Sequence, residues 1–199
     1  MRKGIHITLV ILLCNFVYAI LRYNYFGNVD WEQIPIYIAN KAFAFSAICC
    51  IALSILWGKL PVRDLKVRKF LGLYGFALSI LHVLCTLTIL NPEYFPRFYA
   101  NGKLQLFANI VILCGALAFL FFLIASVCSV NSANQFVYVR RCVFIATIFA
   151  TIHIFARGNS SWIHPNKWYG GMPPISLLSF SVAAIALFSK IIPVNKKSS

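Results

Sequence analysis

Six apolar runs of helix length, separated by short connections, constrain this sequence more than any other feature. Each run can cross ~30 Å of hydrocarbon at a helical rise of ~1.5 Å per residue. A helix also satisfies its own backbone hydrogen bonds, which a membrane interior requires. We therefore expect an all-α bundle of six transmembrane helices that forms a single domain over residues 1–199. The expected helices are about 5–22, 34–57, 70–90, 104–130, 139–156 and 174–192.

The composition supports a lipid bilayer as the surroundings of this chain. Hydrophobic residues make up 61% and charged residues 11% of the sequence, whereas soluble domains have about 45–50% and about 25%. The net charge of +14 comes from short basic clusters between the apolar runs, which is typical of topology signals, so we expect no nucleic-acid partner. All seven cysteines lie within or at the ends of the runs, which favours small buried side chains over disulfides or a zinc site.

The basic residues predict the orientation. If the N-terminus is cytoplasmic, twelve cations lie inside, five lie outside, and Lys41 lies within the second run. This bias predicts a multi-pass protein of the inner (cell) membrane with both termini in the cytoplasm. The first run resembles a signal peptide, but no small-x-small cleavage site follows it, so we expect this helix to be retained.

Two of the apolar runs carry one histidine each. In the run 68–88, small or polar residues repeat at helical spacing and form one stripe: Gly72, Gly75, Ser79, His82 and Thr86. The run 139–156 repeats this plan with Cys142, Ala146, Ala150 and His153. In the expected topology both helices run from inside to outside, and each histidine lies 14 residues after the start of its run. The two imidazoles are therefore expected at matched depth, as axial ligands of one heme iron.

Further residues are candidates for the cofactor site. Gly75, Ser79 and Ala150 would let a macrocycle approach the helices closely. Lys41 and Arg157 are candidate partners of the heme propionates, because a cation at membrane depth usually has a partner.

Each of these features also has a plain structural interpretation. A membrane histidine often only bonds to a neighbouring helix, stripes of small residues are common packing seams, and Lys41 could extend toward the interface. His6 and His164 are expected at the surface.

The same runs resemble a known family. The segment Arg68-Lys69-Phe70-Leu71-Gly72-Leu73-Tyr74-Gly75-Phe76, followed by Leu81-His82, is similar to a motif of the ferric-reductase-like transmembrane domain. The closer likeness is to YedZ-type heme-binding subunits of the periplasmic methionine sulfoxide reductase system. The segment Arg140-Arg141-Cys142-Val143-Phe144, ending at His153, resembles that family's His-Arg-Leu-Val-Tyr run. The likeness covers about half of the chain, and the family also has six helices.

This resemblance implies b-type heme, quinone or flavin (FMN) as the electron source, and a partner that uses the electrons. Arg140 stands where the family has the first histidine of its pair, so we expect one heme and not two. The flavin and nicotinamide domain of full-length ferric reductases is not found in these 199 residues. The expected role is thus the redox membrane subunit of an oxidoreductase system, with no complete catalytic site of its own.

Three functions remain open from the sequence. The first is a heme-binding electron-transfer subunit that passes electrons from quinol or flavin to an acceptor on the outer side, within a larger membrane complex or to a protein redox partner. The second is a non-catalytic scaffold or assembly subunit derived from a heme protein. The third is a small-solute transporter with Lys41 in its pathway. Helices broken by Gly or Pro at related positions of two halves would favour a transporter, but Pro35 and Pro61 lie at helix ends and give no such break.

Overall fold

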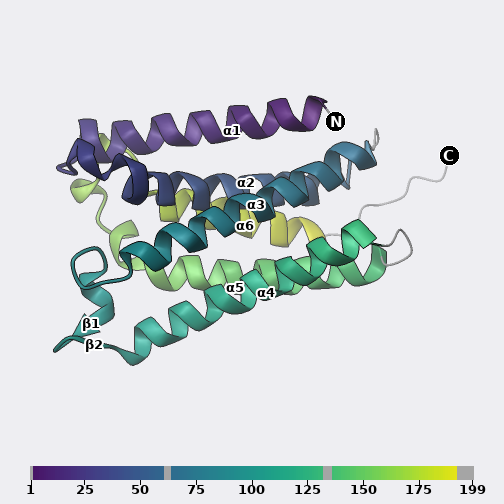
Figure 1. Ribbon diagram of the computed structural model, residues 1–199. Helices are drawn as coiled ribbons and strands as arrows, with labels where there is room; N and C mark the ends of the chain where they lie inside the picture. The colour runs from purple at the N-terminus through teal and green to yellow at the C-terminus, as the bar shows by residue number, and fades with distance from the viewer. Residues whose placement is uncertain (1, 61–63, 132–135, 192–199) are drawn as a thin grey trace.

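The computed structural model describes residues 2–60, 64–131 and 136–191, and its architecture is an all-α bundle (Figure 1). A two-stranded antiparallel hairpin, β1 (Tyr99–Ala100) and β2 (Lys103–Leu104), lies between the third and fourth helices. The six long helices are α1 (Arg2–Ile20), α2 (Ala39–Trp57), α3 (Leu65–Ile89), α4 (Leu106–Asn131), α5 (Phe136–Trp162) and α6 (Ile175–Ile191). Together with short helical turns at their ends, all six are long and apolar enough to cross a membrane, which confirms the predicted fold class.

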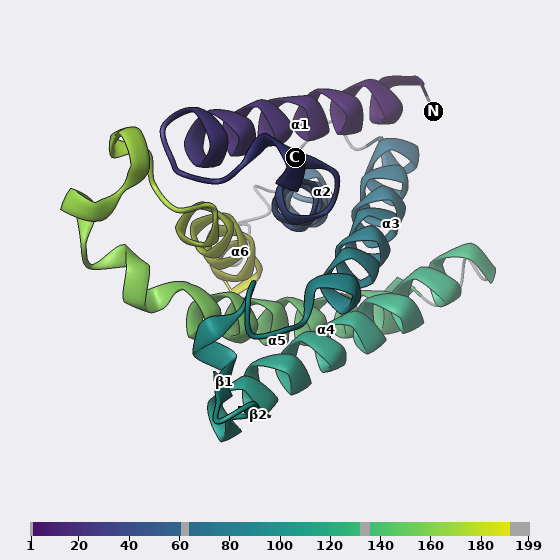
Figure 2. The ribbon, with the colours of Figure 1, turned by 60° about the vertical axis from the view of Figure 1, so that its left-hand side comes forward.

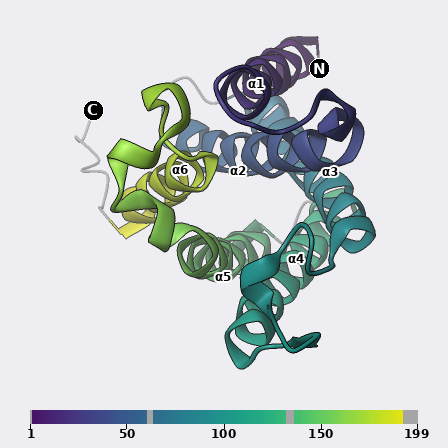
Figure 3. The ribbon, with the colours of Figure 1, turned by 90° about the vertical axis from the view of Figure 1, so that its left-hand side faces the viewer.

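Five of the helices form a closed ring. In the order α2, α3, α4, α5, α6, each helix packs against the next, and α6 returns to α2. Figure 3 shows this ring along the axis of the bundle, with α1 outside it against α2 and α3. Since α4 separates α3 from α5 in this order, the two histidine-bearing helices face each other across the ring.

The two ends of the bundle differ in charge. Helix α1 starts and α6 ends at one end, where α3 and α5 also begin (Figure 1). We call this the basic end because basic residues gather in these helix ends: Arg2, Lys3, Lys66, Arg68, Lys69, Arg140, Arg141 and Lys190. The β1–β2 hairpin marks the opposite end, which we call the hairpin end. Because α3 and α5 both start at the basic end, they run in the same direction, as the sequence predicts.

Helix α2 is the most buried member of the ring, because it packs against α1 as well as α3 and α6, and we call it the central helix. In α2, 67% of the membrane-length stretch is buried, against 17–28% in the other five described spans. Its neighbours turn large apolar side chains outward, for example Leu13, Leu87 and Phe188, which are 65–66% exposed. An outer surface this apolar matches lipid and not water, so the chain is a multi-pass membrane protein.

Helix α5 extends six residues beyond the predicted end at residue 156. Gly158 lets this extended part of α5 lie close against α6, because a Cβ at this position would lie 2.5 Å from Ser176 Oγ on α6. Trp162 Nε1 then donates a hydrogen bond to the same hydroxyl at 3.0 Å. The irregular connection predicted over 157–174 is therefore shorter. Arg22, just beyond the end of α1, contacts this connection by donating a hydrogen bond from its guanidinium group to the Met172 carbonyl at 2.6 Å.

The stripe of small residues on α3 faces α2. A Cβ at Gly75 would lie 2.7 Å from Ile51 Cγ1 and 3.0 Å from the Ala47 carbonyl oxygen, and both partners belong to α2. Gly72 is less crowded, with Ser54 Oγ at 3.3 Å. At Gly72 and Gly75 the stripe is thus a seam that brings two helices together, as small residues do in membranes.

This seam predicts a graded effect of alanine substitutions. We expect Gly75→Ala to lower the thermal unfolding midpoint in detergent, because the new methyl group meets a backbone carbonyl; overpacking of this kind costs about 1–3 kcal/mol. Gly72→Ala is the matched control, since its methyl group meets only a serine hydroxyl. Equal midpoints for the two variants would contradict this account of the α2–α3 contact.

Candidate functional site

His82 projects from α3 and is held by the central helix. Its Nδ1 lies 2.5 Å from Asn40 Oδ1 on α2. The hydroxyl of Thr86, one turn further along α3, donates to the same amide oxygen at 3.2 Å. Because an amide oxygen is an acceptor, this pair places the proton of a neutral His82 on Nδ1.

His153 projects from α5 and is held by α4 in the same way. Its Nδ1 lies 2.8 Å from the backbone carbonyl oxygen of Val111, which can only accept a hydrogen bond. Gly115, one turn further along α4, leaves room for the ring, because a Cβ there would lie 2.9 Å from His153 Nδ1. The glycine and the carbonyl together fix the orientation of this imidazole.

In both imidazoles Nδ1 thus makes the hydrogen bond that holds the ring to a neighbouring helix, and Nε2 has no hydrogen-bond partner among the described residues. In metal sites a ligating histidine almost always donates its second ring N–H to a carbonyl, a carboxylate or water, which fixes the tautomer and the direction of the free nitrogen. His82 and His153 both have this arrangement. In the neutral form of each imidazole, Nε2 is then unprotonated and can bind a metal.

The two histidines lie at the same height in the bundle. Each lies 17 residues after the first residue of its helix, Leu65 for α3 and Phe136 for α5. They are close enough for a charge on His153 to act on His82. Both side chains are partly buried.

Two cations at the hairpin end lie near the histidines. Lys41 follows Asn40 on α2, and its Nζ lies 4.7 Å from the ring centroid of Tyr23 and 4.3 Å from that of Tyr37. Arg157 lies one turn beyond His153, with its guanidinium carbon 5.2 Å from the ring centroid of Phe95. These cations are held by aromatic rings, and no salt bridge is found for either of them in the described chain.

The three small residues predicted at the cofactor site all have packing or hydrogen-bond partners within the protein. Gly75 packs against α2, as described above. Ser79 Oγ donates to the carbonyl of Phe76 on its own helix at 2.7 Å, and Ala150 packs between two apolar clusters of the core. These contacts explain the small side chains by helix packing, and the place of the three residues beside a cofactor stays a prediction.

Sequence reasoning missed the residues that orient the imidazoles. Asn40 had a detectable signal, because an amide next to Lys41 within an apolar run needs a partner. Gly115 had a weaker one, as a lone glycine in the most apolar run. The Val111 carbonyl had none, since every residue carries a carbonyl group and only the approach of α5 selects this one.

The other metal-binding side chains are separate from this pair. In the described part of the chain, no group of three or more His, Cys, Asp and Glu residues could hold a metal ion. All seven cysteines are free; Cys50 and Cys142 are buried, four others are partly buried, and Cys14 is exposed, so the prediction of buried side chains holds for only two of them. His6 and His164 are exposed, as expected. The site thus offers two imidazole ligands and two nearby cations.

The hydrogen bonds to Nδ1 predict the tautomers of the two histidines in the cofactor-free protein. Spectra of ¹⁵N-histidine should show His82 and His153 neutral and protonated on Nδ1, with exposed His6 and His164 as internal controls. Asn40→Leu should release His82 from this tautomer and leave His153 unchanged, because only His82 contacts the amide. Protonation of His153 on Nε2 in the wild type would contradict the described geometry.

No family model matches the chain, and no curated protein matches it. The likeness to ferric-reductase-like domains therefore depends on the two motifs quoted above. The functional argument depends on the paired imidazoles, the hydrogen bonds that orient them and the cations beside them.

Proposed function

We propose that the protein binds one b-type heme between His82 and His153 and serves as an electron-transfer subunit in the membrane. The observation that carries this proposal is the shared arrangement of the two imidazoles. They come from parallel helices on opposite sides of one ring, at matched height, each with Nδ1 engaged and Nε2 free. Two such nitrogens suit the two axial positions of a heme iron.

The residues present fit the cofactor in charge as well as in ligand type. A b heme carries two propionates, and Lys41 and Arg157 are the cations that would receive them. Bound heme supplies one-electron redox chemistry. The chain's own part is to hold the imidazoles in their Nδ1-protonated tautomers, to exclude water with the apolar helices and to provide positive charge nearby.

The proposal places the protein in the inner membrane with both termini in the cytoplasm, which makes the basic end cytoplasmic. The histidines would then lie in the outer half of the membrane. Electrons would enter from a quinol or a flavin such as FMN and leave to an acceptor on the outer side. That acceptor would be a protein redox partner or part of a larger complex, as the likeness to YedZ-type subunits implies.

A second function, a non-catalytic scaffold or assembly subunit, is favoured by the residues at the basic end. Arg140 on α5 and the pair Arg68 and Lys69 on α3 stand where a second heme would need histidines. A chain that has lost one heme site could have lost the other as well. The two functions differ in what they require of His82 and His153.

Absorption spectroscopy separates these functions. After heme-replete expression, the purified wild type should show a reduced-minus-oxidised spectrum of a low-spin b heme with two histidine ligands. His82→Ala and His153→Ala should each abolish this signal, because one imidazole cannot fill both axial positions. His164→Ala is the matched control at an exposed histidine and should leave the spectrum unchanged. A colourless wild type that still assembles with its partners would support the scaffold instead.

Lys41 should also tune the reduction potential. Removing a buried positive charge disfavours the reduced heme, so Lys41→Gln should lower the midpoint potential by an amount on the order of tens of millivolts. Lys103→Gln is the control, because Lys103 is an exposed cation in β2 at the same end of the bundle. Redox titration of the heme spectrum provides the measurement. Equal shifts of the midpoint potential in the two variants would show that Lys41 does not lie beside the heme.

A further inference from the structure

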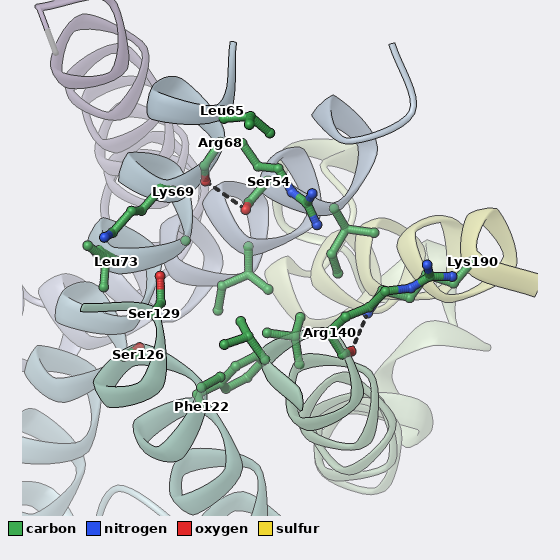
Figure 4. Close-up of a pocket in the computed structure, with 16 residues that line it drawn as sticks. Ser54, Leu65, Arg68, Lys69, Leu73, Phe122, Ser126, Ser129, Arg140 and Lys190 are labelled. Carbon is green, nitrogen blue, oxygen red and sulfur yellow. Dashed lines mark hydrogen bonds between the residues drawn. The ribbon is translucent and has the colours of Figure 1, made fainter. Parts of the chain in front are cut away.

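A second polar site lies at the basic end, away from the histidines. A pocket of about 340 Å³ opens between α2, α3, α4, α5 and α6. Its wall carries four cations from three helices, as Figure 4 shows: Arg68 and Lys69 from α3, Arg140 from α5 and Lys190 from α6. A space of this size holds more than a single small ion, since a water molecule takes up only ~30 Å³ of the liquid.

Three of these cations lie close together. Lys190 Nζ donates to the backbone carbonyl of Arg140 at 3.4 Å, and Arg140 and Arg68 are near enough to repel it. Figure 4 shows the Arg68 side chain reaching from α3 toward the side of the pocket where Arg140 and Lys190 lie. Gly58 leaves room for it, because a Cβ there would lie 2.9 Å from the guanidinium carbon. Like charges held this close favour a bound anion.

Among the described residues, none of those that line the pocket is acidic. The closest acid in sequence, Asp64, begins α3 and accepts hydrogen bonds from the backbone N–H groups of Lys66 and Val67 at 3.0 and 3.2 Å. Its carboxylate therefore caps a helix. An anion from outside the chain would compensate the charge of the pocket.

The rest of the wall is apolar, apart from Ser54, Ser126 and Ser129. Ile51, Ile55, Leu73 and Phe122 line it together with Val143. The cations belong to the ends of their helices: Arg68 is the fourth residue of α3, and Lys190 is the last residue but one of α6. This is the level of lipid headgroups for a helix that spans a membrane. A charged mouth above an apolar wall matches an amphiphile better than a free anion.

We propose that this pocket binds an anionic phospholipid, with its phosphate among Arg68, Arg140 and Lys190 and an acyl chain along the apolar wall. Basic pockets between membrane helices at the cytoplasmic face are suited to such headgroups. Arginine in particular binds phosphate through paired N–H donors. This site is separate from the histidines and does not depend on the proposed heme.

The test compares lipids and charge-matched variants. Purified protein in detergent is titrated with phosphatidylglycerol, with phosphatidylcholine or with inorganic phosphate, and native mass spectrometry and the thermal unfolding midpoint are recorded. Arg140→Gln/Lys190→Gln removes two charges from the pocket. Arg141→Gln/Lys66→Gln removes two exposed charges from the same end of the bundle, on α5 and α3, outside the pocket.

We expect the wild type to bind phosphatidylglycerol ~10-fold or more tightly than phosphatidylcholine. The pocket variant should lose most of this preference, and the surface variant should keep it. Equal binding of the two lipids, or equal losses in both variants, would overturn the proposal. Stabilisation by inorganic phosphate equal to that by phosphatidylglycerol would also overturn it, in favour of a free phosphate. If the double pocket variant does not fold, single Arg140→Gln and Lys190→Gln variants give the same comparison against Arg141→Gln.

Discussion

The hydrogen bonds made by the two histidine Nδ1 atoms connect the fold to the proposed function. One joins α3 to the central helix through Asn40, and the other joins α5 to α4 through the Val111 carbonyl. Within a membrane no bulk water replaces a lost partner, so such bonds fix helix positions firmly. The same bonds direct both free Nε2 atoms. The interactions that hold opposite sides of the ring are therefore also those that would orient the two ligands of the proposed heme.

Positive charge is distributed so that each end of the bundle favours an anion. At the hairpin end, Lys41 and Arg157 lie against aromatic rings near the histidines. At the basic end, Arg68, Arg140 and Lys190 surround a pocket with an apolar wall. With 18 Lys and Arg residues and four acids in the whole chain, internal ion pairs cannot compensate this charge. Heme propionates at one end and a lipid phosphate at the other would each supply what the chain lacks.

The sequence predicted the histidines better than their surroundings. His82 and His153 were identifiable because a histidine is rare in an apolar run and because each lies at the same distance from a basic helix start. The place of Gly75, Ser79 and Ala150 beside the cofactor stays a prediction. In the structure Gly75 packs against α2, Ser79 bonds to its own helix and Ala150 packs in the core. A stripe of small residues has the same spacing whether it faces a ligand or a helix. Spacing therefore could not distinguish the two.

The amino-acid sequence alone determined the six membrane-length helices, because the length of an apolar run decides whether it can span a bilayer. It also determined that α3 and α5 run in the same direction, because successive spans alternate in direction. It also determined the matched height of the two histidines, since helical rise is constant. Only the tertiary structure decided that α4 lies between α3 and α5, that Asn40 and Val111 receive the Nδ1 protons, and that cations from three helices meet in one pocket. These are contacts between residues far apart in the chain, which depend on how the helices pack.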